Sequence, residues 1–252
     1  MKLEIQSFNS FAQESGTVLV TGGSGGIGRA LCLAFARAGL WVGVHYFQHK
    51  AAAEETLAQL STAGGQGAIY QADIRSGSDV QAMIEAVQRR RGRLDVLLCN
   101  AGVAASHLVV RYPEEAWQRI IDTNLTGTYR CLTTAAGVMM EQGGGSMVLI
   151  GSYAGSHGRN GQAAYAASKA GLMGLVQTAA REWGPHNIRV NLVYPGWQPT
   201  GMAGDAFPSS DDLSDHVLGR VSNLDEVGRT ICQLAQLSNV SGQVWNLDSR
   251  IL

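Results

Sequence analysis

A tyrosine and a lysine four positions apart are the residues of this chain best suited to exchange a proton with a substrate. Tyr165 and Lys169 lie in an alanine-rich segment with helical periodicity, 163–183, so a helix would place both on one face. A free phenol has a pKa of about 10, and a nearby ammonium lowers that pKa by favouring the phenolate. The pair is suited to general acid and base catalysis, although such pairs also occur on helix surfaces without a function.

A serine adds a hydroxyl to this group. Ser152 follows the apolar run 147–150 through Gly151, where a strand of an open α/β sheet would end and where such sheets bind ligands. A hydroxyl in this place can hydrogen-bond a substrate oxygen. Because serines are also common in the turns after strands, this residue alone does not identify a site.

A glycine-rich loop indicates a phosphate site. The first apolar run is followed by Thr21-Gly-Gly-Ser-Gly-Gly-Ile-Gly28, with the spacing Gly-x-x-x-Gly-x-Gly. Glycine is needed where the backbone has a positive φ and where no Cβ can stand between main-chain amides and a pyrophosphate. A tight turn without a ligand is the alternative, but the place between a predicted strand and helix favours a dinucleotide. The residues expected to contact it are Gly22, Ser24, Gly25, Gly26, Ile27 and Gly28.

The end of the second predicted strand bears on which dinucleotide is bound. An acidic residue about 20 positions after the loop would hold the 2′-hydroxyl of NAD, but the stretch 44–50 contains no carboxylate. Its basic residues His45, His49 and Lys50 favour the 2′-phosphate of NADP(H), with NAD(H) remaining possible. The other interpretation is that these three residues begin a solvated helix.

Apolar runs alternate with helical segments along the whole chain. Because parallel strands need a crossover, usually a helix, the alternation predicts one doubly wound Rossmann-type α/β domain, a parallel sheet of about seven strands with helices on both faces. The predicted strands are 17–20, 41–46, 68–70, 96–98, 147–150, 188–193 and 244–245, and the predicted helices are 29–38, 51–60, 80–90, 113–140, 163–183 and 224–237. Residues 1–16 are expected to form a surface arm on the domain 17–252, and the irregular stretch 195–220 a substrate lid.

Composition argues against several classes of function. The chain has 252 residues with 19 Lys and Arg against 20 Asp and Glu, which gives no electrostatic footprint for nucleic acid or an anionic membrane. No apolar stretch approaches the roughly 20 residues that span a bilayer, and the charged start Met1-Lys-Leu-Glu4 is unlike a signal peptide, so a cytoplasmic protein is expected. The four cysteines have no zinc or redox spacing, which predicts buried thiols and no metal site: Cys32, Cys99, Cys131 and Cys232.

Taken together, these residues resemble the classical short-chain dehydrogenases/reductases, over nearly the whole chain from Thr17 to Leu247. The motifs that carry the resemblance are the glycine loop, Asn100-Ala101-Gly102, Asn124, Ser152 with Tyr165-x-x-x-Lys169, and Pro195-Gly196. The resemblance implies hydride transfer between a nicotinamide cofactor and a carbonyl compound or alcohol, with the protein supplying orientation and acid–base assistance.

The resemblance also implies a role for each matching residue. Tyr165 would donate a proton to the carbonyl oxygen in reduction, or remove it from the alcohol in oxidation, while Ser152 positions that oxygen. Lys169 would lower the pKa of Tyr165 and hold the nicotinamide ribose. Asn124 would interrupt its helix and keep a water in the proton relay. The remaining expected cofactor contacts are Tyr46 after the second strand, Asp73 and Ile74 at the adenine, Asn100, Ala101 and Gly102 at the ribose, and Pro195, Gly196 and Thr200 at the nicotinamide.

Within that family the chain is most similar to the 3-oxoacyl-(acyl carrier protein) reductases. The similarity rests on His45-Tyr-Phe-Gln48, Lys50-Ala-Ala-Ala-Glu-Glu55, Gly161-Gln-Ala-Ala-Tyr165, Gly219-Arg220, Asp225-Glu-Val227 and Ser241-Gly-Gln243. It implies an NADPH-dependent reductase of 3-oxoacyl thioesters, acting on a small molecule or on a carrier-bound acyl chain, and a homodimer or homotetramer. An NAD(P)-dependent dehydrogenase of secondary alcohols, sugars or steroids is the alternative within the family. A catalytically silent cofactor-binding regulator is the alternative outside it, opposed by the intact set Asn124, Ser152, Tyr165 and Lys169.

Three departures from the reductase pattern stand out. Gly25 replaces a basic residue that is frequent in NADP-binding glycine loops, and Asp248-Ser-Arg250 stands where Asp-Gly-Gly is usual. The stretch Glu141-Gln-Gly-Gly-Gly145 replaces a basic patch before the fifth strand, so an acidic carrier would gain little attraction there.

Overall fold

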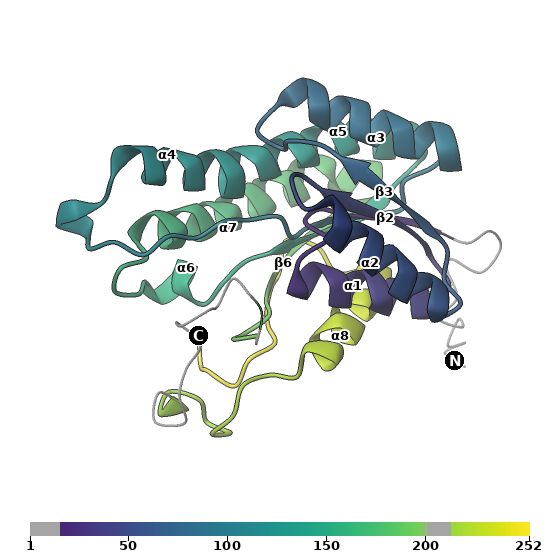
Figure 1. Ribbon diagram of the computed structural model, residues 1–252. Helices are drawn as coiled ribbons and strands as arrows, with labels where there is room; N and C mark the ends of the chain where they lie inside the picture. Colours follow the sequence, from purple (N-terminus) through teal and green to yellow (C-terminus); the bar gives the residue numbers. More distant parts are fainter. Residues whose placement is uncertain (1–15, 199, 201–212) are drawn as a thin grey trace, which may run out of the picture.

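A seven-stranded parallel sheet forms the centre of the computed structural model, which describes residues 16–198, 200 and 213–252 (Figure 1). Its strands lie in the order β3-β2-β1-β4-β5-β6-β7, and every neighbouring pair is parallel. The strands are β1 Thr17–Val20, β2 Trp41–Tyr46, β3 Gly67–Gln71, β4 Val96–Cys99, β5 Gly145–Ile150, β6 Ile188–Tyr194 and β7 Val244–Asn246. The single-domain, doubly wound α/β fold expected from the alternating pattern is confirmed.

Helices cover both faces of this sheet and divide the core into two layers. The longer helices are α1 Gly26–Arg37, α2 Lys50–Thr62, α3 Gly77–Arg91, α5 Thr128–Glu141, α7 Ala163–Trp183 and α8 Leu224–Gln236. Side chains from α1, α2 and α8 form one apolar cluster, and those from α3, α5 and α7 form the other (Figure 1). Neighbouring residues of a strand serve opposite layers: Leu19 packs into the second cluster, whereas Val18 and Val20 pack into the first.

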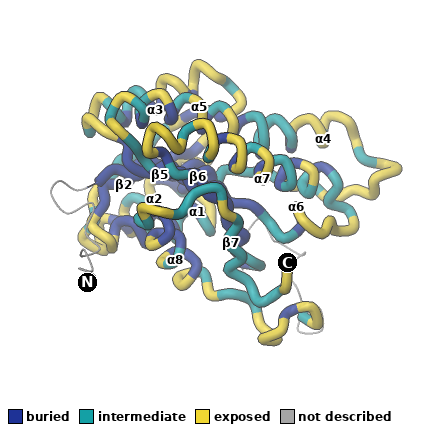
Figure 2. Tube along the Cα trace, turned by 180° about the vertical axis from the view of Figure 1, so that it is seen from behind, coloured by how far each residue is buried: buried dark blue, intermediate teal, exposed yellow. Residues whose placement is uncertain are grey.

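The strand sequences follow from this double cover. Every residue of β1, β2 and β4 is buried, as Figure 2 shows for the centre of the sheet, and continuous apolar runs suit strands covered on both faces. The edge strand β7 is only half-buried. Local chemistry sets some helix ends: Ser76 accepts a hydrogen bond from the Asp79 amide at the start of α3, and Gly92, with a φ of 75°, ends the same helix.

The helix predicted over 113–140 is not continuous. The structure divides it into α4 Glu114–Ile121, a π-helical turn Asp122–Gly127, and α5. At Gly127 a Cβ would lie 2.8 Å from a side-chain carbon of Ile74, so this turn packs closely against the segment after β3. The segment predicted as a helix over 113–140 is therefore helical from Glu114 to Glu141, with the local interruption at Asn124 that the family resemblance implies. Such π-helical turns are frequent at functional sites.

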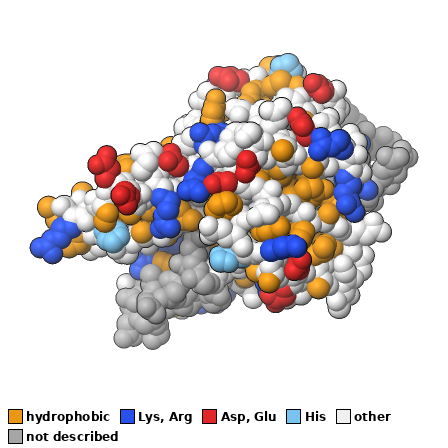
Figure 3. Space-filling model, turned by 45° about the horizontal axis from the view of Figure 1, so that its top comes forward, with side chains coloured by type: hydrophobic (Ala, Val, Ile, Leu, Met, Phe, Trp, Pro, Cys, Tyr) orange, Lys and Arg blue, Asp and Glu red, His pale blue; other side chains and the backbone are white. Residues whose placement is uncertain are grey.

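Other expectations concern the termini, the lid and the surface. Residues 1–15 of the expected arm, and residues 199 and 201–212 of the expected lid, lie outside the described part of the chain. All four cysteines are buried as unpaired thiols, which confirms the prediction made for them. Among the described helices, none is long and apolar enough to cross a membrane. On the face shown in Figure 3, acidic and basic side chains are interspersed rather than gathered by sign.

Candidate active site

The carboxyl ends of four strands bring the predicted residues to one edge of the sheet. The glycine loop follows β1, Asn100 follows β4, Gly151 and Ser152 follow β5, and Pro195 follows β6. Because all strands are parallel and β1, β4, β5 and β6 are neighbours, these segments lie side by side. In open α/β sheets this edge is where ligands bind.

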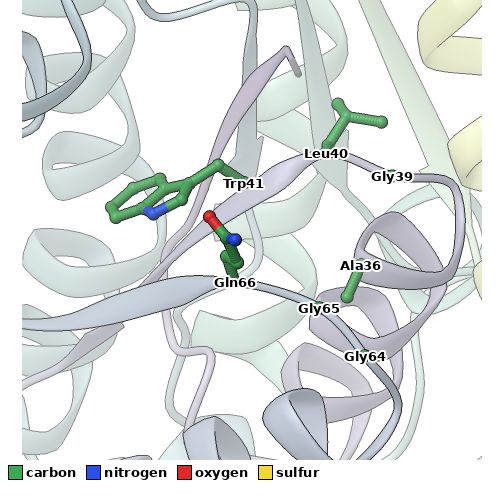
Figure 4. A pocket seen from close by; sticks show the side chains of 7 residues that line it. All are labelled: Ala36, Gly39, Leu40, Trp41, Gly64, Gly65 and Gln66. Carbon is green, nitrogen blue, oxygen red and sulfur yellow. The ribbon is translucent and has the colours of Figure 1, made fainter.

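A pocket of about 190 Å³ lies at the opposite edge and contains none of these residues. It is lined by residues around the start of β2 and the turn before β3, shown in Figure 4: Ala36, Gly39, Leu40, Trp41, Gly64, Gly65 and Gln66. None of the side chains that line it is titratable, so this pocket offers no acid–base chemistry. The candidate active site is therefore the carboxyl edge.

The glycine loop is shaped by contacts that leave no room for side chains. Gly22 has a φ of 64°, and a Cβ on it would lie 2.9 Å from the Cα of Ala101. A Cβ on Gly28 would overlap the carbonyl oxygen of Gly22. Gly25 differs, because its φ of −87° suits any residue and the nearest atom to an added Cβ is 3.6 Å away. The glycines at 22 and 28 are thus required by the fold of the loop.

Two polar side chains tie this loop to β4. The Thr21 hydroxyl accepts hydrogen bonds from the amides of Asn100 at 2.9 Å and Ala101 at 3.1 Å, and donates to the Leu98 carbonyl. The Asn100 amide group donates to the carbonyls of Thr21 and Gly22 at 3.0 and 3.1 Å. Asn100 and Ala101, predicted as cofactor contacts, therefore hold the loop in shape. Thr21, which the sequence interpretation did not single out, is the centre of the network.

The first turn of α1 is suited to an anion. No side chain caps it, no acidic residue lies in its first turn, and the amides there point out of the helix end. A helix N-terminus carries about half a positive charge, which favours a phosphate group. Thr200 contacts Gly26 at this end, so its side chain lies over the loop. The described residues fit a dinucleotide pyrophosphate, with Gly22, Gly26 and Gly28 providing the close approach.

His45 is not the cation that the sequence analysis expected at the adenosine end of the cofactor. The ring is 2% exposed, its Nδ1 accepts a hydrogen bond from the Gly22 amide at 2.9 Å, and its Nε2 lies 3.0 Å from the Ala72 carbonyl, to which it donates. Burial lowers its pKa, so the ring is neutral. The prediction that His45 favours a 2′-phosphate is therefore wrong, because a buried neutral ring beneath the loop has no charge to offer. The predicted strand 41–46 includes His45, and its place in a sheet covered on both faces was the indication that this side chain is buried.

The other residues expected at the adenosine end differ in how far they are buried. Tyr46 and Ile74 are each 5% exposed and belong to the wall. Asp73 is held by Arg75 through hydrogen bonds of 2.6 to 3.0 Å, which keep the pKa of its carboxyl below the ordinary value. The Arg75 guanidinium lies 5.5 Å from the ring centre of Phe47, just after β2. Arg75, absent from the sequence predictions, brings a cation to this end.

Asn124 sits fully buried in the π-helical turn. Its Oδ1 accepts from the Val103 amide at 2.8 Å, and its Nδ2 donates to the Val103 carbonyl at 2.9 Å and to the Ser168 hydroxyl at 3.1 Å. These bonds join the loop after β4 to α7. A Cβ on Gly102 would lie 3.2 Å from Asn124 Oδ1 and 3.8 Å from Lys169 Nζ, so Asn124 and Lys169 both face this glycine.

Lys169 is 4% exposed and is anchored to β5. Its ammonium donates to the Ile150 carbonyl at 2.7 Å and lies 5.7 Å from the ring centre of Tyr165. Burial lowers the pKa of Lys169 to about 8. A lysine with such a pKa is still mostly charged at pH 7 and can exchange its proton readily.

Tyr165 and Ser152 meet at the edge of the sheet. Burial raises the pKa of the Tyr165 phenol, while a hydrogen bond with the Ser152 side chain lowers it. Ser152 also accepts a hydrogen bond from the Ala154 amide at 3.2 Å, which fixes its rotamer. The lowering expected from Lys169 does not appear in this arrangement, because its ammonium is bonded to Ile150 and lies beside the ring rather than at the hydroxyl.

The turn after β6 is held by side chains that sequence inspection did not select. The Pro195 carbonyl accepts hydrogen bonds from Gln198 at 2.7 Å and from the Ser222 hydroxyl at 2.8 Å. Gly196 has a φ of 74°, and a Cβ on it would lie 3.0 Å from Cγ of Asp248. The turn is therefore packed against the end of the chain.

Comparison with known proteins agrees with this geometry. The model of the short chain dehydrogenase family matches residues 16–211, most of the chain. The chain belongs to the short-chain dehydrogenase family. Two similar relatives are both named 3-oxoacyl-(acyl-carrier-protein) reductase. The one from Synechocystis sp. is 36% identical over 233 residues, 91% of this chain and 94% of the relative, and the one from Staphylococcus epidermidis is 38% identical over 205 residues, 81% and 83%.

A solved structure gives the same result in three dimensions. A short-chain type dehydrogenase/reductase from Mycobacterium marinum has a TM-score of 0.86 and 30% identity, covering 96% of this chain and 98% of that one. As a short-chain dehydrogenase, the protein is an NAD(P)-dependent oxidoreductase acting on carbonyl or alcohol groups.

Proposed function

We propose that the protein is an NADPH-dependent reductase of 3-oxoacyl thioesters in which Tyr165 is the proton donor. The observation that carries this proposal is that Lys169 joins Tyr165 to the end of β5 at the carboxyl edge: its ammonium lies 5.7 Å from the ring centre of Tyr165 and donates to the carbonyl of Ile150, two residues before Ser152. One carbonyl oxygen can then accept hydrogen bonds from both hydroxyls. The names of the two relatives support the substrate class.

In the proposed reaction the nicotinamide, when bound, supplies the hydride. Ser152 holds the substrate carbonyl oxygen, and Tyr165 transfers its phenolic proton to that oxygen as negative charge develops there. The ammonium of Lys169, with a pKa of about 8, holds the nicotinamide ribose beside the Tyr165 ring. Asn124 keeps Val103 and Ser168 in place.

The proposed preference for NADPH rests on the adenosine end. The segment after β2 has no carboxylate to repel a 2′-phosphate, and its exposed residues include His49 and Lys50. Lys50 lies 3.5 Å from Glu54, an exposed pair that a phosphate can easily replace. Arg75 stands over Phe47 and already neutralises Asp73. Fluorescence titration tests the preference, and tighter binding of NADH than of NADPH would contradict it.

The thioester can be free or carried by a protein. Glu141 at the end of α5 is exposed, and the turn after it, Gln142 to Gly144, contains no cation. We therefore expect similar kcat/KM values for an acetoacetyl group on coenzyme A and on an acidic carrier protein, because steering by opposite charge is weak at this surface. A large advantage for the carrier would show that another surface binds it.

The decisive experiment compares the wild type with Tyr165→Phe in NADPH oxidation with acetoacetyl-coenzyme A. Removal of the hydroxyl should reduce kcat by at least about a thousandfold, because the proton donor is lost, while the Kd for NADPH changes little. A variant with undiminished turnover would contradict the assignment. If the wild type reduces no 3-oxoacyl thioester but oxidises secondary alcohols, the substrate class is wrong and the catalytic assignment stands.

We also propose that the protein is a homo-oligomer through α4, α5 and α7. Large side chains on these helices are partly exposed: Trp117 is 39%, Tyr129 51% and Met173 38% accessible. Gly174 on α7 has no heavy atom near the position of a Cβ, so a neighbour can approach its backbone closely. Sedimentation at micromolar concentration tests this, and a monomer alone would contradict it.

A further inference from the structure

A buried ion pair lies at the end of the chain. The carboxylate of Asp248 is completely buried, and Arg250, with a side chain only 10% exposed, donates to its Oδ2 from Nε at 2.7 Å and from Nη2. Burying two charges is costly, so removing one partner leaves the other uncompensated. The Arg250 carbonyl also accepts from the Asn246 side chain at 2.6 Å, which closes the segment 246–250 into a compact arm after β7.

The arginine of this arm reaches the turn that carries Ser152. Its guanidinium lies 4.2 Å from the ring centre of Tyr153, the next residue in the chain. That ring is also stacked on His157, with centres 4.0 Å apart and planes 1° apart. The Tyr153 hydroxyl donates to the Ile251 carbonyl at 3.4 Å. The backbone after β5 is therefore held against the arm through an aromatic ring.

The aspartate of the arm reaches two further segments. Its Cγ is the close neighbour of Gly196 described above, and its Oδ1 lies 3.3 Å from Nε2 of His216, a side chain that is 1% exposed. The Ser249 carbonyl accepts from the Val217 amide at 3.2 Å. One short arm thus contacts the turn after β6 and the segment around residue 216, as well as the turn after β5.

We propose that Arg250 and Asp248 are positioning residues that hold Ser152 against Tyr165 and set the turn at Gly196. The inference rests on the proposed role of Ser152 and goes beyond it, because it assigns the alignment of that hydroxyl to the carboxyl end of the chain. Arg250 stands at a position where the family resemblance led us to expect glycine.

The pH dependence separates alignment from simple stabilisation. In alcohol oxidation Tyr165 must accept a proton, so the rate rises with pH through its pKa. The Ser152 hydrogen bond lowers that pKa, so a loosened Ser152 raises it and moves the profile to higher pH. Lys169 also faces Tyr165, but Ile150 anchors it independently of the arm. His157 stacks on Tyr153 and is unchanged by substitutions in the arm.

The experiment compares Arg250→Met and Arg250→Lys with Arg37→Met, an exposed arginine at the end of α1. Arg250→Met should lower kcat roughly ten- to hundredfold, since small misplacements of reacting groups have effects of this size, and should shift the oxidation profile to higher pH. Arg250→Lys should recover part of the loss, because it keeps a cation over Tyr153 but not the bidentate contact. Arg37→Met should behave as wild type.

Thermal unfolding shows whether each variant is folded, and Asp248→Asn supplies the same comparison if Arg250→Met does not fold. A folded Arg250→Met protein with the wild-type profile and less than a twofold change in kcat would overturn the inference. Ser152→Ala tests the proposed catalytic role of Ser152 separately from the positioning role of Arg250. If Ser152→Ala is fully active, the proposed catalytic assignment fails, whatever the result at Arg250.

Discussion

The glycine loop and the C-terminal arm hold two parts of the carboxyl edge of the sheet by different means. The loop is held by neutral hydrogen bonds from Thr21, Asn100 and His45 and by contacts that exclude a Cβ. The arm is held by the buried charges of Asp248 and Arg250. The glycine loop should therefore be insensitive to salt but should not accept an added methyl group, whereas the arm should in addition be sensitive to the loss of either charge.

The largest effect is expected where the loop has no space. Gly28→Ala should weaken NADPH binding by at least about a hundredfold, because the new Cβ overlaps the Gly22 carbonyl and displaces the helix end from the pyrophosphate. Gly25→Ala is the matched control, with room for a Cβ and an ordinary φ, and should change the Kd less than about threefold. Equal Kd values for the two variants in fluorescence titration would show that the loop is not held by steric exclusion.

A smaller effect is expected beneath the loop. His45→Ala leaves the Gly22 amide without its acceptor and should lower the free energy of unfolding by about 1–3 kcal/mol, measured in urea at pH 7. His49→Ala, at an exposed position, is the control and should have almost no effect. A similar loss in the free energy of unfolding in both variants would contradict the proposed role of His45 in holding the loop.

The burial of His45 predicts how the free energy of unfolding depends on pH. Burial lowers the pKa of His45 in the folded state, so the unfolded chain binds the proton first as the pH falls below about 6.5. The stability that the neutral ring contributes is complete above that pH and declines below it, by at most about 1.4 kcal/mol per pH unit. His45→Ala should flatten the curve in this range. An unchanged slope would mean that other groups cause the acid sensitivity.

The smallest effect is expected from a substitution that adds a charge to the loop instead of removing a contact. Gly25→Arg places a cation beside the adenosine phosphates at a position with a permissive backbone. NADPH should bind roughly three- to tenfold more tightly, while the Kd for NADH changes less, because only NADPH has the 2′-phosphate. The measurement is the ratio of the Kd for NADH to the Kd for NADPH. A ratio equal to that of the wild type would show that the 2′-phosphate does not lie near residue 25.

Much of the fold was predictable because its determinants are local. Each of the seven strands was predicted within two residues of either end, since a buried parallel strand is a continuous apolar run. The glycines at 22 and 28 and the pair Tyr165 and Lys169 were found for a similar reason: their chemistry depends on spacing within one segment. The interruption of the helix over 113–140 at Asn124 was expected only from the family resemblance, because the partners of its side chain, Val103 and Ser168, lie in other segments of the chain.

The residues that were missed act across the sheet. His45 was interpreted as a cation for the 2′-phosphate because it lies near the end of the second predicted strand, in a stretch with other basic residues and no carboxylate. Its partners are Gly22 and Ala72, and only the packing of β1, β2 and β3 joins them. Asp248 and Arg250 are two residues apart, yet their effect depends on Tyr153, almost a hundred positions earlier. Such long-range side-chain contacts have no periodicity that a single sequence displays.

The position of β1 has a consequence for how the chain is made. Val18 pairs with Val42 on one side and with Val96 on the other, so the strand that emerges first lies in the middle of the sheet. At synthesis rates of about 5–20 residues per second, roughly 4–15 seconds pass between the appearance of Val18 and that of its second partner. During that interval one edge of a strand that is fully buried in the folded protein has no partner. The nascent chain must therefore be shielded from other nascent chains before its cofactor loop can form.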